Sequence, residues 1–256
     1  MTINQIIENF KKNNPETETT MIQLAYDFAV KAHAGQRRKS GEPYIQHSLH
    51  TAFVLIQIKA DMETIIAGLL HDIPEDTEFT LADIEKNFGK EIANLVEGIT
   101  KLSKIKYRGI ERYRESLRKM FLAMANDLRV ILIKFADRLH NLRTLESLPL
   151  EKRQRIARET LEIYAPIANR LGIREIAGDL EDLAFKYVYP KEYQEVTKQV
   201  KDRYIKGKEY LQRIIPLVKK ILAKKNIRVI EIHARAKHYY SLYRKLLRYD
   251  MDWHKI

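Results

Sequence analysis

The sequence predicts an almost entirely α-helical protein, on two observations. Apolar residues recur at intervals of three and four over most of the chain, as they do on the buried face of a helix. The β-branched alternation of a strand occurs only in residues 227–236, IRVIEIHARA. With 256 residues, of which 45% are hydrophobic, the chain is long enough for one large or two small domains. We therefore expect an all-α fold with a short α/β segment near the C-terminus.

Glycine, proline and capping residues divide the N-terminal half into helices. Residues 34–44, AGQRRKSGEPY, indicate a loop. Pro74 lacks a backbone N–H and must end or kink the apolar helix before it. Thr80 and Asp83 have the spacing of a capping box, and Gly89 suits a C-cap. Helices are therefore expected at residues 18–34, 45–58, 62–71, 80–89 and 90–102.

The C-terminal half continues the helical pattern and carries most of the charge. Helices are expected at about residues 111–126, 128–147, 151–171 and 174–187, with a long one at about 190–225. Residues 191–256 hold 18 Lys and Arg against 7 Asp and Glu, whereas residues 1–190 hold 28 against 27. Such a basic segment suits a polyanionic partner, a nucleotide or an RNA or ribosome surface, or is simply a solvated helix.

The composition also indicates the cellular compartment and which side chains could bind a metal. No apolar run approaches the ~18–20 residues of a membrane span, and the N-terminus has no signal-peptide core. The chain has no cysteine, so any metal must be bound by histidine and carboxylate groups. We expect a cytoplasmic protein with no membrane partner.

Three predicted helices each offer ligand-type groups beside apolar residues. His47 begins one, and His71 and Asp72 end another in the stretch AGLLHDIPEDTEFT (67–80). In the third helix, Asp137, Asn141 and Thr144 recur at i, i+4 and i+7 on one face. Two imidazoles and two carboxylates suit a borderline divalent ion such as Mn²⁺, and Zn²⁺ and Fe²⁺ also accept them. Taken alone, His47 is more typical of a structural histidine, the acidic stretch at 71–76 is equally consistent with a solvated helix cap, and Asp137 is consistent with an ion pair to Arg138. We assign His33, His50 and His140 to the structural or surface class.

The order H…HD…D is the ligand pattern of the HD-domain metal phosphohydrolases. The wider motifs RRKSGEPYIQH, HDIPEDT, FGKEIANLVEGITKL, VILIKFADRLHNLRTL and RETLEIYAPIANRLGI resemble the N-terminal half of the RelA/SpoT homologues of bacterial stringent control. The resemblance implies an HD-domain helical bundle over residues 1–150. It also implies a helical linker that completes the bundle (151–195), and a basic helix with a truncated start of a synthetase domain (196–256).

The resemblance also implies residue roles. It implies that one Mn²⁺ is bound by His47, His71, Asp72 and Asp137, and that Glu75 and Asp76 are the catalytic acids. It implies substrate contacts by Arg38, which packs on the guanine ring, and by Lys39, Ser40, Tyr44, Asn141 and Thr144. Pro74 would end the helix between the two acidic pairs, so that the catalytic acids turn toward the substrate.

The activity that this resemblance implies is hydrolysis of the 3′-pyrophosphate of guanosine tetra- or pentaphosphate, giving GDP or GTP. The cations at 101–108 would help to attract the substrate. Three alternatives stay open: another HD-family nucleotide phosphohydrolase, a catalytically silent module that binds guanine nucleotides, and an RNA- or ribosome-binding fragment. The motif RRKSGEPY favours hydrolysis of guanosine tetra- or pentaphosphate over the activity of another HD phosphohydrolase, because other HD phosphohydrolases are not expected to carry it.

The segment RAKHYYSLYRKL (235–246) resembles the opening ATP-binding element of the family's synthetase domain. Its matching positions are Arg235, Lys237, Ser241 and Lys245. The family's later metal-binding aspartate and catalytic glutamate have no counterpart before Ile256. We therefore expect no synthetase activity from these residues alone.

Overall fold

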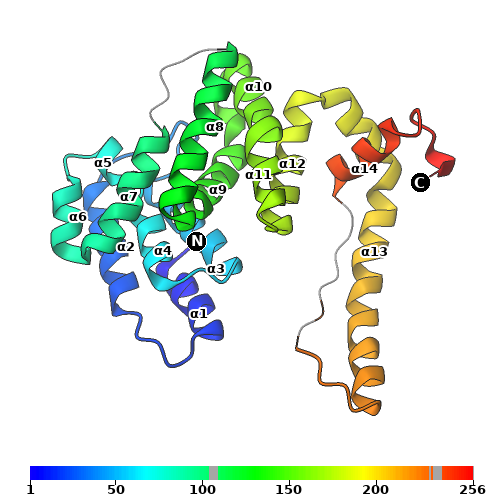
Figure 1. Ribbon diagram of the computed structural model, residues 1–256, viewed down its shortest axis with the longest axis horizontal. Coiled ribbons are helices and arrows are strands. Elements are labelled where there is room, and N and C mark those ends of the chain that lie inside the picture. The colour runs from blue at the N-terminus through cyan, green and yellow to red at the C-terminus, as the bar shows by residue number, and fades with distance from the viewer. Residues whose placement is uncertain (104–108, 231, 233–237, 256) are drawn as a thin grey trace. The chain divides into compact units, whose positions relative to one another are not determined.

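The computed structural model of the chain describes residues 1–103, 109–230, 232 and 238–255 (Figure 1). These residues form helices, turns and loops, and no strand occurs among them, so the all-α prediction is confirmed. Within the predicted strand, residues 227–230 and 232 are described and form no strand, so the prediction is wrong there. The other positions of that segment lie outside the described residues.

The chain divides into two compact units, Met1–Leu180 and Glu181–Ile256. The predicted boundaries at residues 150 and 195 stay predictions. The elements of the first unit are α1 Ile3–Asn13, α2 Thr20–Ala32, α3 Ile45–Gln57, α4 Met62–Leu70, α5 Ile73–Asp76, α6 Leu81–Phe88, α7 Lys90–Ser103, α8 Gly109–Asn126, α9 Leu128–Arg143, the 3₁₀ turn η1 Leu145–Ser147, α10 Leu150–Glu159, the π turn η2 Thr160–Tyr164, α11 Ala165–Arg170 and the start of α12 Arg174–Val188.

Helix α4 is the centre of the first unit. Every residue from Thr64 to Leu70 is buried, as expected of a helix that is apolar all round. It contacts α2, α3, α7 and α9, and α3 also packs directly on α9. The C-terminal end of α4 therefore places His71 in the interior, near α3, which carries His47, and α9, which carries Asp137.

Local capping explains why several of these helices begin and end where they do. Thr80 and Asp83 form the predicted capping box of α6, and Gly89 follows it with a φ of 89°. Helix α1 was not expected, although Thr2 and Gln5 form a second capping box at its start.

Two proline residues alter the predicted helices. Helix α4 ends at Leu70, and Pro74 lies in the first turn of α5, where its missing N–H costs no helical hydrogen bond. Pro74 therefore helps to start a helix instead of ending one, which corrects the prediction. The expected helix at 151–171 is interrupted by η2, where the Ala165 N–H bonds to the Thr160 carbonyl. Pro166 follows directly and has no N–H to give to the next bond of the regular ladder.

The second unit contains the end of α12, α13 Pro190–Lys224, α14 Tyr239–Leu247 and the 3₁₀ turn η3 Trp253–Lys255. Its core consists of Phe185, Val196, Tyr243 and Leu246. Ser241 and Lys245 lie on α14 and line one cavity of about 340 Å³ together with Arg244, Arg248 and Tyr249. Arg235 and Lys237 lie outside the described residues, so the ATP-binding role of this motif stays a prediction.

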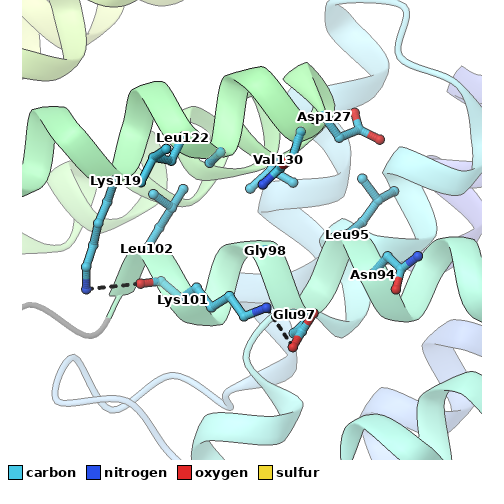
Figure 2. A pocket seen from close by; sticks show the side chains of 12 residues that line it. Asn94, Leu95, Glu97, Gly98, Lys101, Leu102, Lys119, Leu122, Asp127 and Val130 are labelled. Carbon is cyan, nitrogen blue, oxygen red and sulfur yellow. Dashed lines mark hydrogen bonds and ion pairs between the residues drawn. The ribbon is translucent and has the colours of Figure 1, made fainter.

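Gly98 allows α7 to approach α9 closely, and Figure 2 shows it facing Val130. A Cβ atom at Gly98 would lie 2.8 Å from Val130 Cγ2 and 3.2 Å from Cγ1. We expect Gly98→Ala to lower the free energy of unfolding by about 1 kcal/mol, because overpacking costs ~1–3 kcal/mol and the better helix propensity of alanine returns ~1 kcal/mol. Urea unfolding measures this difference.

The matched control for this prediction is the same change in a Val130→Ala background. There the clash is absent, and Gly98→Ala should stabilise the chain by up to ~1 kcal/mol through helix propensity alone. Stabilisation of the otherwise unaltered chain by Gly98→Ala would contradict the close approach.

Candidate metal centre

The start of α3, the C-terminal end of α4 and the middle of α9 meet at a buried cluster of ligand-type atoms. One nitrogen from each of His47 and His71 and one carboxylate oxygen of Asp137 all lie within 4.8 Å of one another. His47 is 0%, His71 1% and Asp137 6% exposed. Buried groups of this kind are paired or bind metals, so the described residues include a set that could hold a divalent ion.

Asp72, the fourth predicted ligand, faces the same point. Its Oδ2 lies 3.2 Å from His47 Nε2, and its Oδ1 lies 3.2 Å from His71 Nε2. The two Nε2 atoms are 3.2 Å apart, and His47 Nε2 is 3.4 Å from Asp137 Oδ1. The structure therefore brings the four predicted ligands together around the Nε2 atoms of both imidazoles.

The other ring nitrogen of His71 fixes how this imidazole can act. His71 Nδ1 lies 2.9 Å from the Gly68 carbonyl oxygen, which can only accept, so Nδ1 carries a proton. Metal-binding histidines commonly donate their second N–H in this way. His71 Nε2 is left as the atom that can bind an ion.

Asp137 is oriented by its own helix. Lys134 Nζ lies 2.9 Å from Oδ2, and Asn141 Nδ2 donates to Oδ1. Burial disfavours the charged carboxylate, but Lys134 and the nearby His47 hold the pKa of Asp137 well below its usual range. Asn141, a residue predicted to contact the substrate, therefore also orients a predicted metal ligand. Lys134 was not predicted, although its i, i+3 spacing to Asp137 was visible in the sequence.

The electrostatics of the cluster favour charged pairs in the metal-free chain. Burial alone would lower the pKa of His71, but Asp72, followed by Asp137, raises it to about 9. The pKa of Asp72 is held well below its ordinary value, since the charge of His71 and the hydrogen bond from His47 outweigh burial. At neutral pH His71 is therefore protonated, and an ion that binds its Nε2 would have to displace this proton.

This proton predicts a pH dependence of metal binding. An ion needs the neutral imidazole, so below about pH 9 the apparent affinity should fall as the pH falls, by close to tenfold per unit. Titration calorimetry at pH 7.5 in two buffers of different ionisation enthalpy should detect about one proton released per ion. Binding that is independent of pH between 6.5 and 8 would contradict the raised pKa of His71.

Asp76 and Tyr44 extend the centre toward solvent. Tyr44 Oη lies 2.7 Å from Asp72 Oδ2 and 2.5 Å from Asp76 Oδ2. Burial, together with these two carboxylates, raises the pKa of the Tyr44 hydroxyl, so it stays a donor. Tyr44 thus joins a predicted metal ligand to a predicted catalytic acid. Glu75 is exposed beside Asp76 on α5.

The loop at 34–44 and helix α9 enclose a cavity of about 530 Å³, a volume typical of small-molecule sites. The six residues predicted to contact the substrate all line it, and so does Asp76. The full lining is Arg37, Arg38, Lys39, Ser40, Tyr44, Asp76, Arg138, Asn141, Thr144, Leu145, Ser147, Leu148, Lys152 and Ile156. The cations of this lining favour an anionic ligand. Lys152 and Ile156 come from α10 and were not predicted, although they lie four residues apart on one helix face.

The Arg38 side chain extends from this cavity to the side of the His47 imidazole that faces away from the other predicted metal ligands. Its Nη1 lies 3.0 Å from His47 Nδ1 and 2.9 Å from His140 Nδ1, and its Nη2 donates to Asn141 Oδ1 at 2.6 Å. His140 is 3% exposed, so of the two classes expected for it, structural or surface, it is not a surface residue. Burial and the neighbouring His47 lower the pKa of His140 to about 2, so this imidazole is neutral.

A second and larger cavity, of about 730 Å³, lies between α7, α8 and α9 (Figure 2). Its apolar lining includes Leu95, Leu102 and Val130, and Lys101 at its rim pairs with Glu97 at 2.8 Å. Lys101, one of the cations expected to attract the substrate, belongs to its lining, and the other cations of that segment, Lys104, Lys106 and Arg108, lie outside the described residues. None of the four predicted metal ligands lines this larger cavity.

The helical bundle and its His/Asp cluster define a class of protein with a divalent-metal centre between helices. The model of the HD domain family matches residues 25–174, more than half of the chain, and the chain belongs to this family. Among its relatives, a guanosine-3′,5′-bis(diphosphate) 3′-pyrophosphohydrolase of Aquifex aeolicus (strain VF5) is 51% identical over 228 residues, which are 89% of this chain and 32% of that protein.

Two further relatives are similar over nearly the whole chain. The bifunctional (p)ppGpp synthase/hydrolase SpoT of Escherichia coli (strain K12) is 46% identical over 99% of this chain and 36% of its own. A protein named GTP pyrophosphokinase from Streptomyces antibioticus is 46% identical over 96% of this chain and 29% of its own. These similarities confirm the resemblance to the RelA/SpoT homologues. The chain spans about a third of the length of these relatives.

Among the described residues, no helix combines the length and the apolar character needed to cross a bilayer.

Proposed function

We propose that this chain hydrolyses the 3′-pyrophosphate of guanosine tetra- and pentaphosphate with the help of one Mn²⁺ ion, leaving GDP or GTP. One observation carries the proposal. The cavity lined by the six predicted substrate contacts also contains Asp76, and Tyr44 links Asp76 to the metal cluster. A nucleotide in this cavity would lie beside both the metal ligands and a carboxylate base. The names of two relatives that include 3′-pyrophosphohydrolase or hydrolase activity support the same reaction.

The donor set fits a divalent ion. Two imidazole Nε2 atoms and two carboxylates form a mixed nitrogen and oxygen set, which suits Mn²⁺, and the Gly68 carbonyl holds His71 in the tautomer that binding needs. His47, His71, Asp72 and Asp137 would hold the ion. When bound, a divalent ion polarises phosphoryl oxygens and makes water a stronger acid.

The chain's own residues supply the remaining functions. Asp76, with Glu75 beside it, would take a proton from the attacking water, a role typically worth ~10²–10⁴ in rate. Tyr44 would hold the Asp76 carboxylate in place through its 2.5 Å hydrogen bond.

Substrate binding would fall to the cations of the cavity. The planar, weakly hydrated Arg38 guanidinium suits the face of a guanine ring. Arg37, Lys39 and Lys152 line the same cavity and would attract the phosphates. A polyphosphate nucleotide therefore matches both the flat and the charged parts of the lining.

The decisive experiment incubates the full chain with guanosine tetraphosphate and Mn²⁺ and follows GDP and pyrophosphate. Product that forms with Mn²⁺ and disappears with a chelator supports the proposal. Binding of the nucleotide without turnover would instead indicate a regulatory module. Turnover of other nucleotides in preference to guanosine tetraphosphate would indicate a different HD phosphohydrolase.

A further inference from the structure

We propose that His140 is a positioning residue that couples the metal ligand His47 to the substrate-binding Arg38. The inference rests on the proposed function for the role of Arg38, whereas its geometry does not depend on the substrate. His140 Nδ1 lies 2.8 Å from His47 Nδ1 and 2.9 Å from Arg38 Nη1. One buried nitrogen of α9 thus contacts side chains from α3 and from the 34–44 loop.

The chemistry of these groups determines which atom accepts. Arg38 is always a donor. His47 directs Nε2 at the two carboxylates and His71, so a metal ion would take the lone pair of Nε2 and leave the proton on Nδ1. Because Arg38 Nη1 can only donate, His140 Nδ1, which lies 2.9 Å from it, is an acceptor without a proton, and His140 Nε2 carries the proton. Arg38 Nη1 also lies 3.0 Å from His47 Nδ1. With an ion on His47 Nε2, His47 Nδ1–H would become a second donor, which shares the acceptor His140 Nδ1 with Arg38.

The same contacts continue to the other side of the metal cluster. Arg38 Nη2 donates to Asn141 Oδ1 at 2.6 Å, and Asn141 in turn donates to the metal ligand Asp137. Arg38 therefore lies in a closed ring with His47, His140, Asn141 and Asp137. In this closed set of contacts, the acceptor atom of His140 fixes both the plane of the His47 imidazole and the position of the Arg38 guanidinium. Partners of this kind set the tautomer and basicity of a metal ligand.

Two substitutions of His140 separate the acceptor from simple space filling. The side-chain oxygen of asparagine can take the place of imidazole Nδ1, whereas the amide of glutamine extends to the place of Nε2. We expect His140→Gln to weaken Mn²⁺ binding about 10- to 100-fold, the usual effect of removing such a partner, and to raise KM because Arg38 loses its acceptor. His140→Asn should restore most of both properties, although it fills less volume than glutamine.

Calorimetric Mn²⁺ titration without substrate and a KM against kcat comparison measure these effects, with circular dichroism confirming the fold of each variant. The matched control is His50→Gln. The His50 ring stacks on His140 at 4.7 Å but is outside the hydrogen-bonded ring, so Mn²⁺ affinity should be unchanged. If glutamine preserves Mn²⁺ affinity at His140, or if asparagine fails as badly as glutamine, His140 is only a packing residue and the inference is overturned.

A second measurement uses the unaltered chain and so does not depend on how a variant folds. Two-bond ¹H–¹⁵N correlation of the histidine rings, with diamagnetic Zn²⁺ bound, should show His140 protonated on Nε2 alone and His47 protonated on Nδ1. A His140 proton on Nδ1 would overturn the inference. Neither this spectrum nor the Mn²⁺ titration contains guanosine tetraphosphate, so the proposed function can fail while the coupling stands, and the reverse.

Discussion

Asp72→Ala should reduce pyrophosphate release from guanosine tetraphosphate to background, and His71→Ala should do the same. Both side chains face the point where the imidazole Nε2 atoms and Asp137 converge. A bound ion supplies several kcal/mol of transition-state stabilisation, so losing it corresponds to about 10³-fold or more in rate. Steady-state release of pyrophosphate, followed over a range of Mn²⁺ concentrations, measures the effect.

Glu78→Ala is the matched control for this prediction. Glu78 lies in the same acidic stretch and is exposed, and it does not line the cavity of about 530 Å³. The Glu78→Ala variant should release pyrophosphate at the same rate as the unaltered chain and bind Mn²⁺ with the same affinity. Substantial turnover by Asp72→Ala or His71→Ala at saturating Mn²⁺ would remove these residues from the proposed site.

Local signals predicted much of the fold. The capping box of Thr80 and Asp83 and the glycine at 89 fixed both ends of α6, because these signals act within a few residues of each other. The interruption at η2 was missed because apolar periodicity continues through it, and only the position of Pro166 indicated a change. Pro74 was misassigned because a proline can end one helix or begin the next, and the sequence alone does not distinguish these positions.

The sequence predicted which residues form the site, but it did not predict which of their side chains contact one another. His47 and His140 are 93 positions apart, so no local pattern shows that their ring nitrogens meet. Tyr44 was expected in the substrate pocket, but its hydrogen bonds to Asp72 and Asp76 depend on how the 34–44 loop folds against α5. Contacts between distant segments require the tertiary structure.

The structure also separates the two predicted catalytic acids. Asp76 lines the cavity of about 530 Å³ and accepts from Tyr44 at 2.5 Å, whereas Glu75 is not part of that lining. We therefore expect Asp76→Asn to lower kcat by about 10²–10⁴, the usual contribution of a general base. Its Mn²⁺ affinity should be retained, because the Asp76 carboxylate is paired with the Tyr44 hydroxyl, whereas Asp72 lies 3.2 Å from the Nε2 atoms of both imidazoles. Glu75→Gln should have the smaller effect of the two.

Tyr44→Phe tests how Asp76 is held in place. The phenyl ring can keep the stacking on His33, at 4.4 Å between ring centroids, while the hydrogen bonds to Asp72 and Asp76 are lost. A lost hydrogen bond to a charged group costs ~1.5–3 kcal/mol, so kcat should fall about 10- to 100-fold. The same change in an Asp76→Asn background should lower kcat much less, because Tyr44 and Asp76 act through one contact.

The result that would contradict the Asp76→Asn prediction is a loss of Mn²⁺ binding. In that case Asp76 is a metal ligand, and the division between metal-binding and proton-accepting carboxylates is wrong.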